Sequence, residues 1–533
     1  MSQINVTNLT FYYEGSFDNV FENVSFSIDT NWKLGFIGRN GKGKSTFLNL
    51  LMGKYEYKGS ISTSTVFDYF PYQITAAQHE QCAAEFLEDL KVNCELWRVL
   101  CELDKLSVDA QVLYRPFHTL SHGERTKVML AVLFSGENDF LLIDEPTNHL
   151  DLESREIVKK YLAQKKGFIL VSHDRDLLDA CIDHVLVLNR QTIEVQNGNF
   201  SSWWENKTRK DAFLQAENEK HKREISKLKI ASERTKQWAD KSEHSKIGFD
   251  PVKEHDRSIS TRSYIGSKTK KMQSRVKQME ERIDREIEEK EGLLQDIESP
   301  VDLKLFPMTH HKEVLIATRE YGLQYEDQAE PLFSNLKLEL KQGDRIFLNG
   351  KNGCGKSSLI KQILRHIAPE LEGAGTAKRS NLDSKEEQLT KNRTILLRET
   401  GSLQTASGLI VSYINQDTSF LKGSIKEYCK ARDLDESLFC SLLRQLDMER
   451  IQFAKNIEDF SEGQKKKVLL ASSLLTPAHV YIWDEPLNYI DIFSRMQIEK
   501  LLTEYKPTML MVEHDVRFRE KIATGVIDMD NIG

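Results

Sequence analysis

The sequence has no apolar run that approaches the roughly 20 residues of a membrane-spanning helix. Its first six residues also lack the basic and apolar segments that together mark a signal peptide. The seven cysteines include no C-x-x-C pair and no histidine at zinc-binding spacing. These absences predict a cytoplasmic protein with reduced thiols and no membrane partner.

An excess of positive charge is absent as well. The 74 lysines and arginines are outnumbered by 81 aspartates and glutamates, which gives a net charge of −7. A polyanionic partner would therefore have to be bound by a local basic patch, and the average charge neither indicates nor excludes nucleic acid. With 533 residues, 39% of them hydrophobic and 29% charged, the chain is expected to form two or more soluble globular domains.

What the sequence does contain is the pattern G-x-x-x-x-G-K-[ST], twice, at residues 38–45 and 350–357. Each copy follows an apolar run and precedes a helical pattern. The backbone N–H groups of such a loop surround phosphate oxygens, its lysine reaches the β- and γ-phosphates, and its serine hydroxyl can bind Mg²⁺. The following helix adds the favourable dipole of its N-terminus. Two copies in register predict two nucleotide sites.

The motifs that follow each loop are also repeated in the same order. A glutamine comes first (Gln73, Gln416), then a serine–x–glycine signature (121–123, 461–463), a strand ending in Asp-Glu-Pro (144–146, 484–486) and a His-Asp pair (173–174, 514–515). Glu145 and Glu485 are 340 positions apart, but Lys44 and Lys356 only 312. About thirty extra residues therefore lie in the second half. We assign them to the polar stretch 375–408 and interpret it as a disordered surface loop.

This set of motifs, present twice, resembles the ATP-binding cassette superfamily. Two cassettes without membrane spans, joined by a charge-rich linker of about a hundred residues, resemble its ABC-F branch of translation factors. Segments 31–41, 483–489 and 512–515 are similar to the Lsa-type antibiotic-resistance members. The expected fold is α/β, with two ABC-type P-loop ATPase domains in tandem: a first cassette (residues 1–203) and a second cassette (306–533). A long α-helical hairpin linker (204–305), with its tip at about 240–265, is expected between them.

Hydrolysis of a phosphoanhydride requires a neutralised triphosphate and an oriented water. Lys44 and Lys356 would neutralise phosphate charge, and Glu145 and Glu485 are the candidate bases for the attacking water. His173 and His514 would contact the γ-phosphate. The oxygen ligands expected to surround Mg²⁺ beside ATP are Ser45, Gln73, Asp144, Ser357, Gln416 and Asp484. The Asp-Glu pairs could alternatively be helix caps, but the complete set of motifs outweighs that interpretation.

The resemblance also implies that the cassettes pair head to tail within a monomer. The first ATP would then lie between Lys44 and the signature Ser461 and Gly463, and the second between Lys356 and the signature Ser121 and Gly123. The other expected nucleotide contacts are Gly38, Asn40, Gly41, Gly43, Ser45 and Thr46 in the first loop and Gly350, Asn352, Gly353, Gly355, Ser357 and Ser358 in the second.

Two pairs of candidates carry open alternatives. Tyr13 and Tyr325 occupy the place where the family stacks an aromatic ring on adenine, and ordinary strand-edge tyrosines are an equal alternative. Gln73 follows Tyr72, one position later than the usual Y-x-P-Q spacing. Its metal role is therefore less well supported than that of Gln416.

The linker has its own pattern. Apolar residues recur every three, four or seven positions between Met272 and Ile297, which predicts a helix with a narrow apolar stripe. The lysine- and glutamate-rich stretch 210–234 would form the first arm of a hairpin about 45 Å long. Between the arms, residues 236–271 contain helix breakers and about nine basic against about five acidic side chains. A solvated spacer and a polyanion-binding tip are equally compatible with this composition.

The resemblance favours the second interpretation. It implies that the linker enters the exit-tRNA site of the 70S ribosome, contacts 23S rRNA and the P-site tRNA, and protects the peptidyl-transferase centre from lincosamides, pleuromutilins and streptogramin A. A housekeeping ABC-F factor without resistance activity is the alternative, and a transporter's ATPase subunit is a weaker one. The candidate contacts at the tip are Lys246, Arg257, Ile259, Arg262 and Tyr264.

Overall fold

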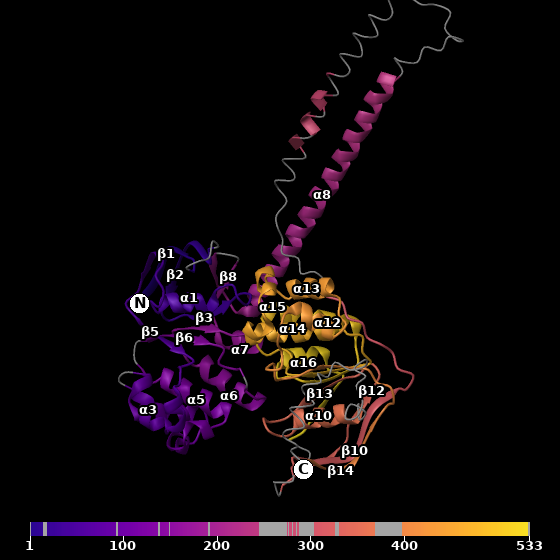
Figure 1. The fold of residues 1–533 in the computed structure, drawn as a ribbon. Coiled ribbons are helices and arrows are strands. Elements are labelled where there is room, and N and C mark those ends of the chain that lie inside the picture. The colour runs from indigo at the N-terminus through magenta and orange to yellow at the C-terminus, as the bar shows by residue number, and fades with distance from the viewer. Residues whose placement is uncertain are drawn as a thin grey trace, which may run out of the picture. The chain divides into compact units, whose positions relative to one another are not determined.

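The computed structural model describes most of both cassettes and part of the linker (Figure 1). The described residues are 2–13, 19–91, 94–136, 139–148, 150–189, 192–244, 274, 277–279, 281–283, 285–286, 303–325, 330–367 and 397–530. The chain divides into two compact units, Met1–Trp203 with Pro300–Gly533 and Trp204–Ser299. The first unit contains both cassettes and the second contains the linker.

The central sheet of the first cassette has six strands in the order β5-β6-β7-β3-β8-β9. Its first five strands are parallel, and only the pairing of β8 with β9 is antiparallel. Both faces of β7 are buried, as the continuous apolar sequence of a parallel strand requires. The strands are β5 (Val66–Phe70), β6 (Asp139–Asp144), β7 (Phe168–Val171), β3 (Lys33–Ile37), β8 (His184–Leu188) and β9 (Ile193–Asn197). An antiparallel sheet of β1 (Gln3–Phe11), β2 (Phe21–Asp29) and β4 (Lys58–Ser62) accompanies it.

The second cassette repeats this topology. Its parallel sheet has the order β15-β16-β17-β13-β18, which matches the first five strands of the first cassette one for one. These strands are β15 (Val411–Ile414), β16 (Val480–Asp484), β17 (Met509–Val512), β13 (Arg345–Asn349) and β18 (Gly525–Asp528). The accompanying antiparallel sheet contains β10 (Val314–Tyr325), β11 (Phe333–Leu336), β12 (Glu339–Lys341) and β14 (Leu397–Thr405). The predicted duplication of an α/β ATPase domain is confirmed.

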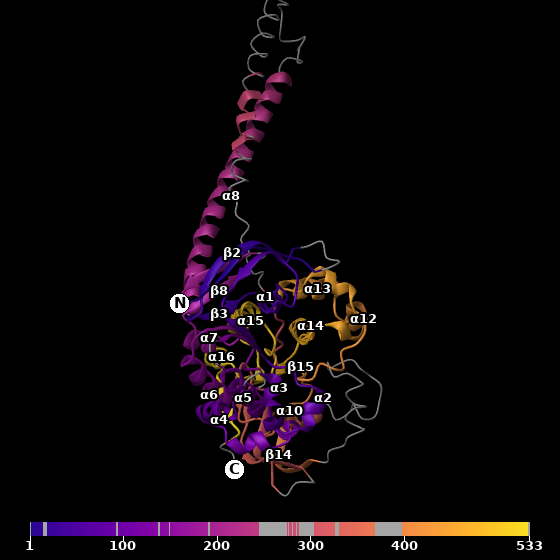
Figure 2. The ribbon, with the colours of Figure 1, turned by 90° about the vertical axis from the view of Figure 1, so that its left-hand side faces the viewer.

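Helices cover the sheets of both cassettes (Figures 1 and 2). In the first cassette they are α1 (Lys44–Leu51), α2 (Ala76–Glu80), α3 (Ala83–Leu90), α4 (Leu96–Lys105), α5 (His122–Leu133), α6 (Leu152–Ala163) and α7 (Arg175–Cys181). In the second cassette they are α10 (Lys356–Ile367), α12 (Ile425–Ala431), α13 (Glu436–Gln445), α14 (Glu462–Leu475), α15 (Ile492–Tyr505) and α16 (Val516–Ile522). Short 3₁₀ turns lie at Ala110–Tyr114, Phe117–Thr119, Arg450–Ala454 and Ile457–Asp459.

Side-chain caps fix where the functional helices begin. Ser121 and Ser461 form capping boxes at the starts of α5 and α14, so each signature serine is also the N-cap of a helix. Asp151 and Asp491 cap α6 and α15 in the same way. The Asp-Glu pairs at 144–145 and 484–485 are not the residues that cap these helices, which removes the capping interpretation of those pairs.

The linker contains one long described helix, α8 (Phe200–His244), which confirms the predicted helical first arm. The described residues of the return arm between 274 and 286 are also helical. Ile225 on α8 and Ile283 on the return arm are both buried, and Ile283 belongs to the predicted apolar stripe. The tip, with Lys246, Arg257, Ile259, Arg262 and Tyr264, lies outside the described residues. Among the described helices, none is long and apolar enough to cross a membrane.

The prediction of a disordered loop over 375–408 is wrong for its C-terminal part. Residues 397–405 form β14, which pairs with β10 from Ile316↔Thr405 to Tyr325↔Leu397. This strand occupies the place that β4 has beside β1 in the first cassette. Six of its nine residues are exposed and none is buried. Its polar sequence carries no apolar alternation, and backbone pairing with β10 determines its conformation. Residues 375–396 lie outside the described range.

The pairing of β14 with β10 can be tested with two glycines of identical φ. Gly401 in β14 and Gly408 after it both have φ +75. A Cβ at Gly401 would meet the backbone carbonyls of Glu320 and Arg319, the latter at 2.5 Å, whereas nothing lies within 4 Å at Gly408. Gly408→Ala should lower the unfolding temperature by roughly 2–4 °C, because alanine disfavours positive φ. Gly401→Ala should lower it at least twice as much, and equal shifts in calorimetry would contradict this register.

Candidate active site

Both phosphate loops lie where the sequence places them, between β3 and α1 and between β13 and α10. The loops hold all the predicted glycines and asparagines, and Ser45, Thr46, Ser357 and Ser358 lie in the first turns of the helices that follow. The lysines point back into their own loops. Lys44 Nζ donates to Gly38 O at 2.6 Å, and Lys356 Nζ donates to Gly350 O at 2.7 Å. Burial lowers the pKa of Lys44, and the carboxylates of Asp491, Glu145 and Asp144 act in the opposite direction. Each loop thus holds a buried cation ready for phosphate.

The strand-end aspartates lie beside the loop serines. Ser45 Oγ donates to Asp144 Oδ2 at 3.1 Å. Burial raises the pKa of Asp484 to about 6, while nearby Ser357 lowers it. Neither carboxylate oxygen of Asp484 has a hydrogen-bond partner of ordinary geometry among the described residues. In both sites a hydroxyl lies beside a carboxylate, and the carboxylate of Asp484 is also buried without such a partner. Hard oxygen ligands of this kind fit Mg²⁺.

The candidate bases follow these aspartates in a strained conformation. Glu145 and Glu485 have φ values of 50° and 49°, a region that residues other than glycine seldom adopt. The N–H groups of the two glutamates donate to Val171 O and Val512 O on the neighbouring strands, which fixes the turn. As a result, His173 Nε2 lies 3.4 Å from Glu145 Oε1, and His514 Nε2 lies 3.8 Å from Glu485 Oε1. The structure therefore brings each predicted base and its histidine together.

The first phosphate loop faces the second cassette. Asn40 Nδ2 donates to Tyr489 O at 2.9 Å, and a Cβ on the signature Gly463 would lie 3.8 Å from the same nitrogen. Beyond the signature, Arg39 forms an ion pair with Asp447, and Lys42 Nζ lies 2.9 Å from Glu449 Oε1. The second signature thus lies next to the first loop.

The second phosphate loop faces the first cassette in the corresponding way. Lys351 Nζ lies 2.9 Å from Glu153 Oε2, and the backbone N–H of Asn352 donates to the Asp151 carboxylate. The signature Gly123 lies close to Asp151 and Glu153 in its own cassette, because a Cβ on Gly123 would be 3.2 Å from Ser154 Oγ. The two cassettes are therefore arranged head to tail.

The two candidate adenine-stacking tyrosines occupy matching positions. Tyr13 OH lies 2.6 Å from Thr46 Oγ1, and Tyr325 OH lies 3.1 Å from Ser358 Oγ. Tyr13 remains 43% exposed and makes edge contacts with Phe11 and Tyr55. Each tyrosine is thus held beside its own phosphate loop, so a stacking role and a strand-edge role both remain compatible with its position.

The family model described as ABC transporter matches residues 21–148 and 333–488, more than half of the chain. The chain belongs to the ABC transporter family. Its similarity to curated ATP-binding proteins assigns it to the ABC-F branch, as the resemblance predicted, and its two domains are ATPase domains.

Several relatives match nearly the whole chain. The ribosome protection protein VmlR of Bacillus subtilis is 28% identical, over 99% of this chain and 87% of VmlR. The ATP-binding protein Uup of Buchnera aphidicola is 26% identical, over 98% of this chain and 80% of Uup. The solved archaeal ribosome recycling factor aABCE1, in complex with the stalk protein aP1, is 16% identical with a TM-score of 0.58, over 98% of this chain and 87% of that one. That likeness concerns the fold.

The two ATPase sites differ in how they hold the candidate base. Glu485 Oε2 accepts hydrogen bonds from Gln416 Nε2 at 2.8 Å and from Asn488 Nδ2 at 2.6 Å. Burial would raise the pKa of Glu485, but His514, Gln416 and Lys466 outweigh it and hold the pKa at about 2. Burial and the Asp144 carboxylate raise the pKa of Glu145 to about 8. Asn488 was not predicted, although its place three residues after Glu485 is visible in the sequence.

Gln73 does not occupy the position predicted for it. Strand register places Phe70 beside Ile143 and Ile414 beside Trp483, the residues that precede the two candidate metal-binding aspartates. Tyr72, two residues after Phe70, is therefore the counterpart of Gln416, and Gln73 comes one position later with an exposed side chain.

Tyrosines occupy this part of the first site. Tyr72 OH donates to Asp68 Oδ2 at 2.7 Å, away from the glutamate. Tyr69 OH instead donates to Asp144 Oδ2 at 3.1 Å. The sequence could have indicated this position of Tyr69, because the Y-x-P spacing aligns Tyr69 with Tyr413.

The asymmetry predicts different effects of equivalent glutamine substitutions. Gln416→Ala should lower steady-state ATP hydrolysis by roughly tenfold, because Glu485 loses a donor that orients it. Gln73→Ala, the matched control, should stay within twofold of the unsubstituted protein. ATPase assays at saturating ATP measure both, and equal losses would mean that Gln73 reaches its site when nucleotide binds.

Proposed function

We propose that this ABC-F ATPase binds the ribosome and protects the peptidyl-transferase centre from antibiotics. The observation that carries the proposal is the combination of two ATPase sites facing each other with a long helical arm inserted between their sequences. The name of the relative VmlR, a ribosome protection protein, supports the same conclusion.

In this proposal ATP holds the two cassettes together. Each triphosphate would lie between one phosphate loop and the opposite signature, with its charge neutralised by Lys44 or Lys356. Ser45 with Asp144, and Ser357 with Asp484, would hold Mg²⁺, which supplies charge neutralisation at the phosphates. The contact of Asn40 with Tyr489 beside Gly463 supports this arrangement, because it places one signature at the other cassette's loop.

Hydrolysis would then release the cassettes. Glu145 and Glu485 would each accept a proton from the attacking water, which lies in line with the γ-phosphate. His173 and His514, close to these carboxylates, would hold the γ-phosphate. Once the γ-phosphate leaves, the contacts that it provides to the opposite signature are lost. Nucleotide thus sets how long the protein stays bound to its partner.

In the proposal, the long helical arm contacts the parts of the ribosome that the cassettes do not reach. Helix α8 has 45 residues, which corresponds to roughly 68 Å at 1.5 Å per residue. In the proposal its tip reaches 23S rRNA and the P-site tRNA of the 70S ribosome, through Lys246, Arg257, Ile259, Arg262 and Tyr264. The nine basic residues within 236–271, in a chain of net charge −7, support contact with nucleic acid. A housekeeping ABC-F factor without resistance activity remains the alternative function.

Replacing Glu145 and Glu485 together by glutamine tests the clamp. The variant should still bind ATP but lack the base, so the cassettes should remain closed on the ribosome. We expect it to co-sediment with ribosomes in ATP, not in ADP, and to inhibit translation in a cell-free system. Normal ATPase activity in this variant would contradict the assignment of both glutamates.

Shortening the tip tests resistance against the housekeeping alternative. Removing several residues between Lys246 and Tyr264 should preserve ATPase activity and most ribosome affinity, because the remaining contacts still contribute to a summed electrostatic attraction. Resistance to lincosamides and pleuromutilins should nevertheless be lost, because reaching the drug site depends on the length of the loop. Minimum inhibitory concentrations in a sensitive host measure this.

Two controls interpret the outcome. The unsubstituted chain must raise the inhibitory concentrations, or the housekeeping function is the correct one. Arg257→Ala and Ile259→Ala should give smaller losses that depend on the drug. Full protection by the shortened protein would make the tip a spacer.

A further inference from the structure

The loops that carry the two histidines, His173 and His514, run directly into short helices that pack against each other across the cassettes. His173 precedes α7 and His514 precedes α16, and these helices are in contact. Asp174 and Asp515, the residues after the histidines, cap the two helices. Whatever holds a cap in place therefore also limits the position of the histidine beside it.

Asp515 is held by arginines from both cassettes. Arg495 of the second cassette lies 3.3 Å from Asp515 Oδ2, and Arg175 of the first lies 3.9 Å from Asp515 Oδ1. Asp515 Oδ1 also accepts the N–H of Phe518 at 3.0 Å. Burial would raise the pKa of Asp515, but Arg495, Arg175 and the Phe518 N–H lower it further than burial raises it. The carboxylate next to His514 is thus a buried anion that is paired with a cation from each cassette.

Arg175 is itself anchored in the second cassette. Its guanidinium forms two hydrogen bonds with the Glu499 carboxylate on α15, one of them at 3.3 Å. Arg175 is 7% exposed and Glu499 is fully buried. Lys521 on α16 completes the cluster, 3.2 Å from Glu499 Oε2. A planar, bidentate pair of this kind fixes direction as well as distance, so Arg175 has little freedom to leave Asp515.

The surroundings of Asp174, the equivalent cap beside His173, contain different side chains. Val516 opens α16 where Arg175 opens α7, and Lys159 lies eight residues after the α6 cap where Glu499 lies eight residues after the α15 cap. Valine cannot donate a hydrogen bond, and Lys159 pairs with Glu156 on its own helix. Asp174 is held by Arg155 of its own cassette, at 3.8 Å.

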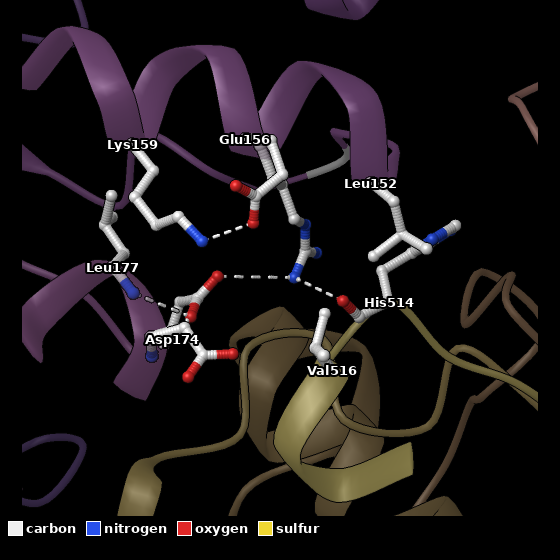
Figure 3. A pocket seen from close by; sticks show the side chains of 9 residues that line it. Leu152, Glu156, Lys159, Asp174, Leu177, His514 and Val516 are labelled. Carbon is white, nitrogen blue, oxygen red and sulfur yellow. Dashed lines mark hydrogen bonds and ion pairs between the residues drawn. The ribbon is translucent and has the colours of Figure 1, made fainter. Parts of the chain in front are cut away.

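A pocket lies beside Val516, the residue that corresponds to Arg175. Figure 3 shows Val516 and His514 facing Asp174, Lys159 and Leu177 across this pocket. At the equivalent place beside Asp515, the Arg175–Glu499 pair is present instead. On this side Arg517 on α16 crosses to α7, where it forms ion pairs with Asp176 and Asp179. In addition, Arg155 NH1 donates to the backbone carbonyl of His514 at 3.5 Å. This bond again acts on the loop of His514. Arg155 and Arg175 of the first cassette therefore act on the second histidine loop itself. Arg517 of the second cassette instead pairs with carboxylates of α7, beyond the Asp174 cap of the first loop.

We propose that Arg175 is a positioning residue for the second ATPase site: through Glu499 and Asp515, the first cassette fixes the loop of His514. The inference rests on the proposed assignment of Glu485 and His514 to that site. Coupling of binding between two sites must be mutual, but coupling of a rate need not be. Hydrolysis at the second site should therefore depend on Arg175 far more than hydrolysis at the first.

The test measures single-turnover ATP hydrolysis by the full-length protein with one site active at a time. Glu145→Gln leaves the second site active, and Glu485→Gln leaves the first. Arg175→Met and Glu499→Met are introduced together, since removing one partner alone would leave an unpaired buried charge. With the second site active, we expect the rate constant at saturating protein to fall at least fivefold, with half-saturation within twofold. With the first site active, the rate constant should stay within twofold.

A matched control and a structural readout complete the test. Lys159→Met, at the place equivalent to Glu499, should change neither rate by more than twofold. Hydrogen exchange should accelerate in a peptide covering 509–518 but not in one covering 168–177. Equal losses at both sites, or no loss at the second, would overturn the proposal. Residual hydrolysis in Glu145→Gln/Glu485→Gln would instead contradict the site assignment.

Discussion

Charge buried between the two cassettes is the constraint on which the rest of the structure depends. Lys44, the candidate phosphate ligand of the first loop, is buried, which lowers its pKa. The carboxylate that most raises this pKa again is Asp491 of the other cassette. Asp491 is fully buried in turn, and Lys467, the N–H of Ser494 and His173 hold its pKa at about 2 against the effect of burial. Because an unpaired buried charge is strongly unfavourable, Lys44 of the first site depends on a carboxylate of the opposite cassette. The pairing of the cassettes and the chemistry of the sites are therefore one arrangement.

The duplication makes this arrangement nearly, but not fully, symmetric. The parallel sheets match strand for strand, and both strained glutamates adopt the same left-handed conformation. The differences lie in side chains that reach across from other elements. Glu485 is held by Gln416 and Asn488, while Tyr72 occupies the place of Gln416 in the first site. Such differences allow two sites with the same motifs to hydrolyse ATP at different rates, which would give the proposed clamp distinct closing and opening steps.

Much of the fold followed from local pattern. The phosphate loops, the Asp-Glu ends of β6 and β16 and the helical arm α8 are each encoded within a few turns of chain, where spacing alone identifies the geometry. The same holds for the pairs Glu145–His173 and Glu485–His514, since parallel strands bring their carboxyl ends to one edge of a sheet. The strand β14 could not be predicted in this way. Its exposed polar residues have no alternation, and only pairing with β10 makes it a strand.

The sequence by itself determined the chemistry of this protein: which side chains can bind phosphate, hold a metal and take a proton, and that each set occurs twice. Tertiary structure decided which copy of each set works with which partner. The spacing beside Gln73 showed that it was one position late, and strand register then showed that Tyr72 takes its place. Nothing near Arg175 reveals Glu499, which lies more than three hundred residues away. Spacing along a chain fixes what neighbours can do, but the packing of two domains fixes which distant charges are buried together.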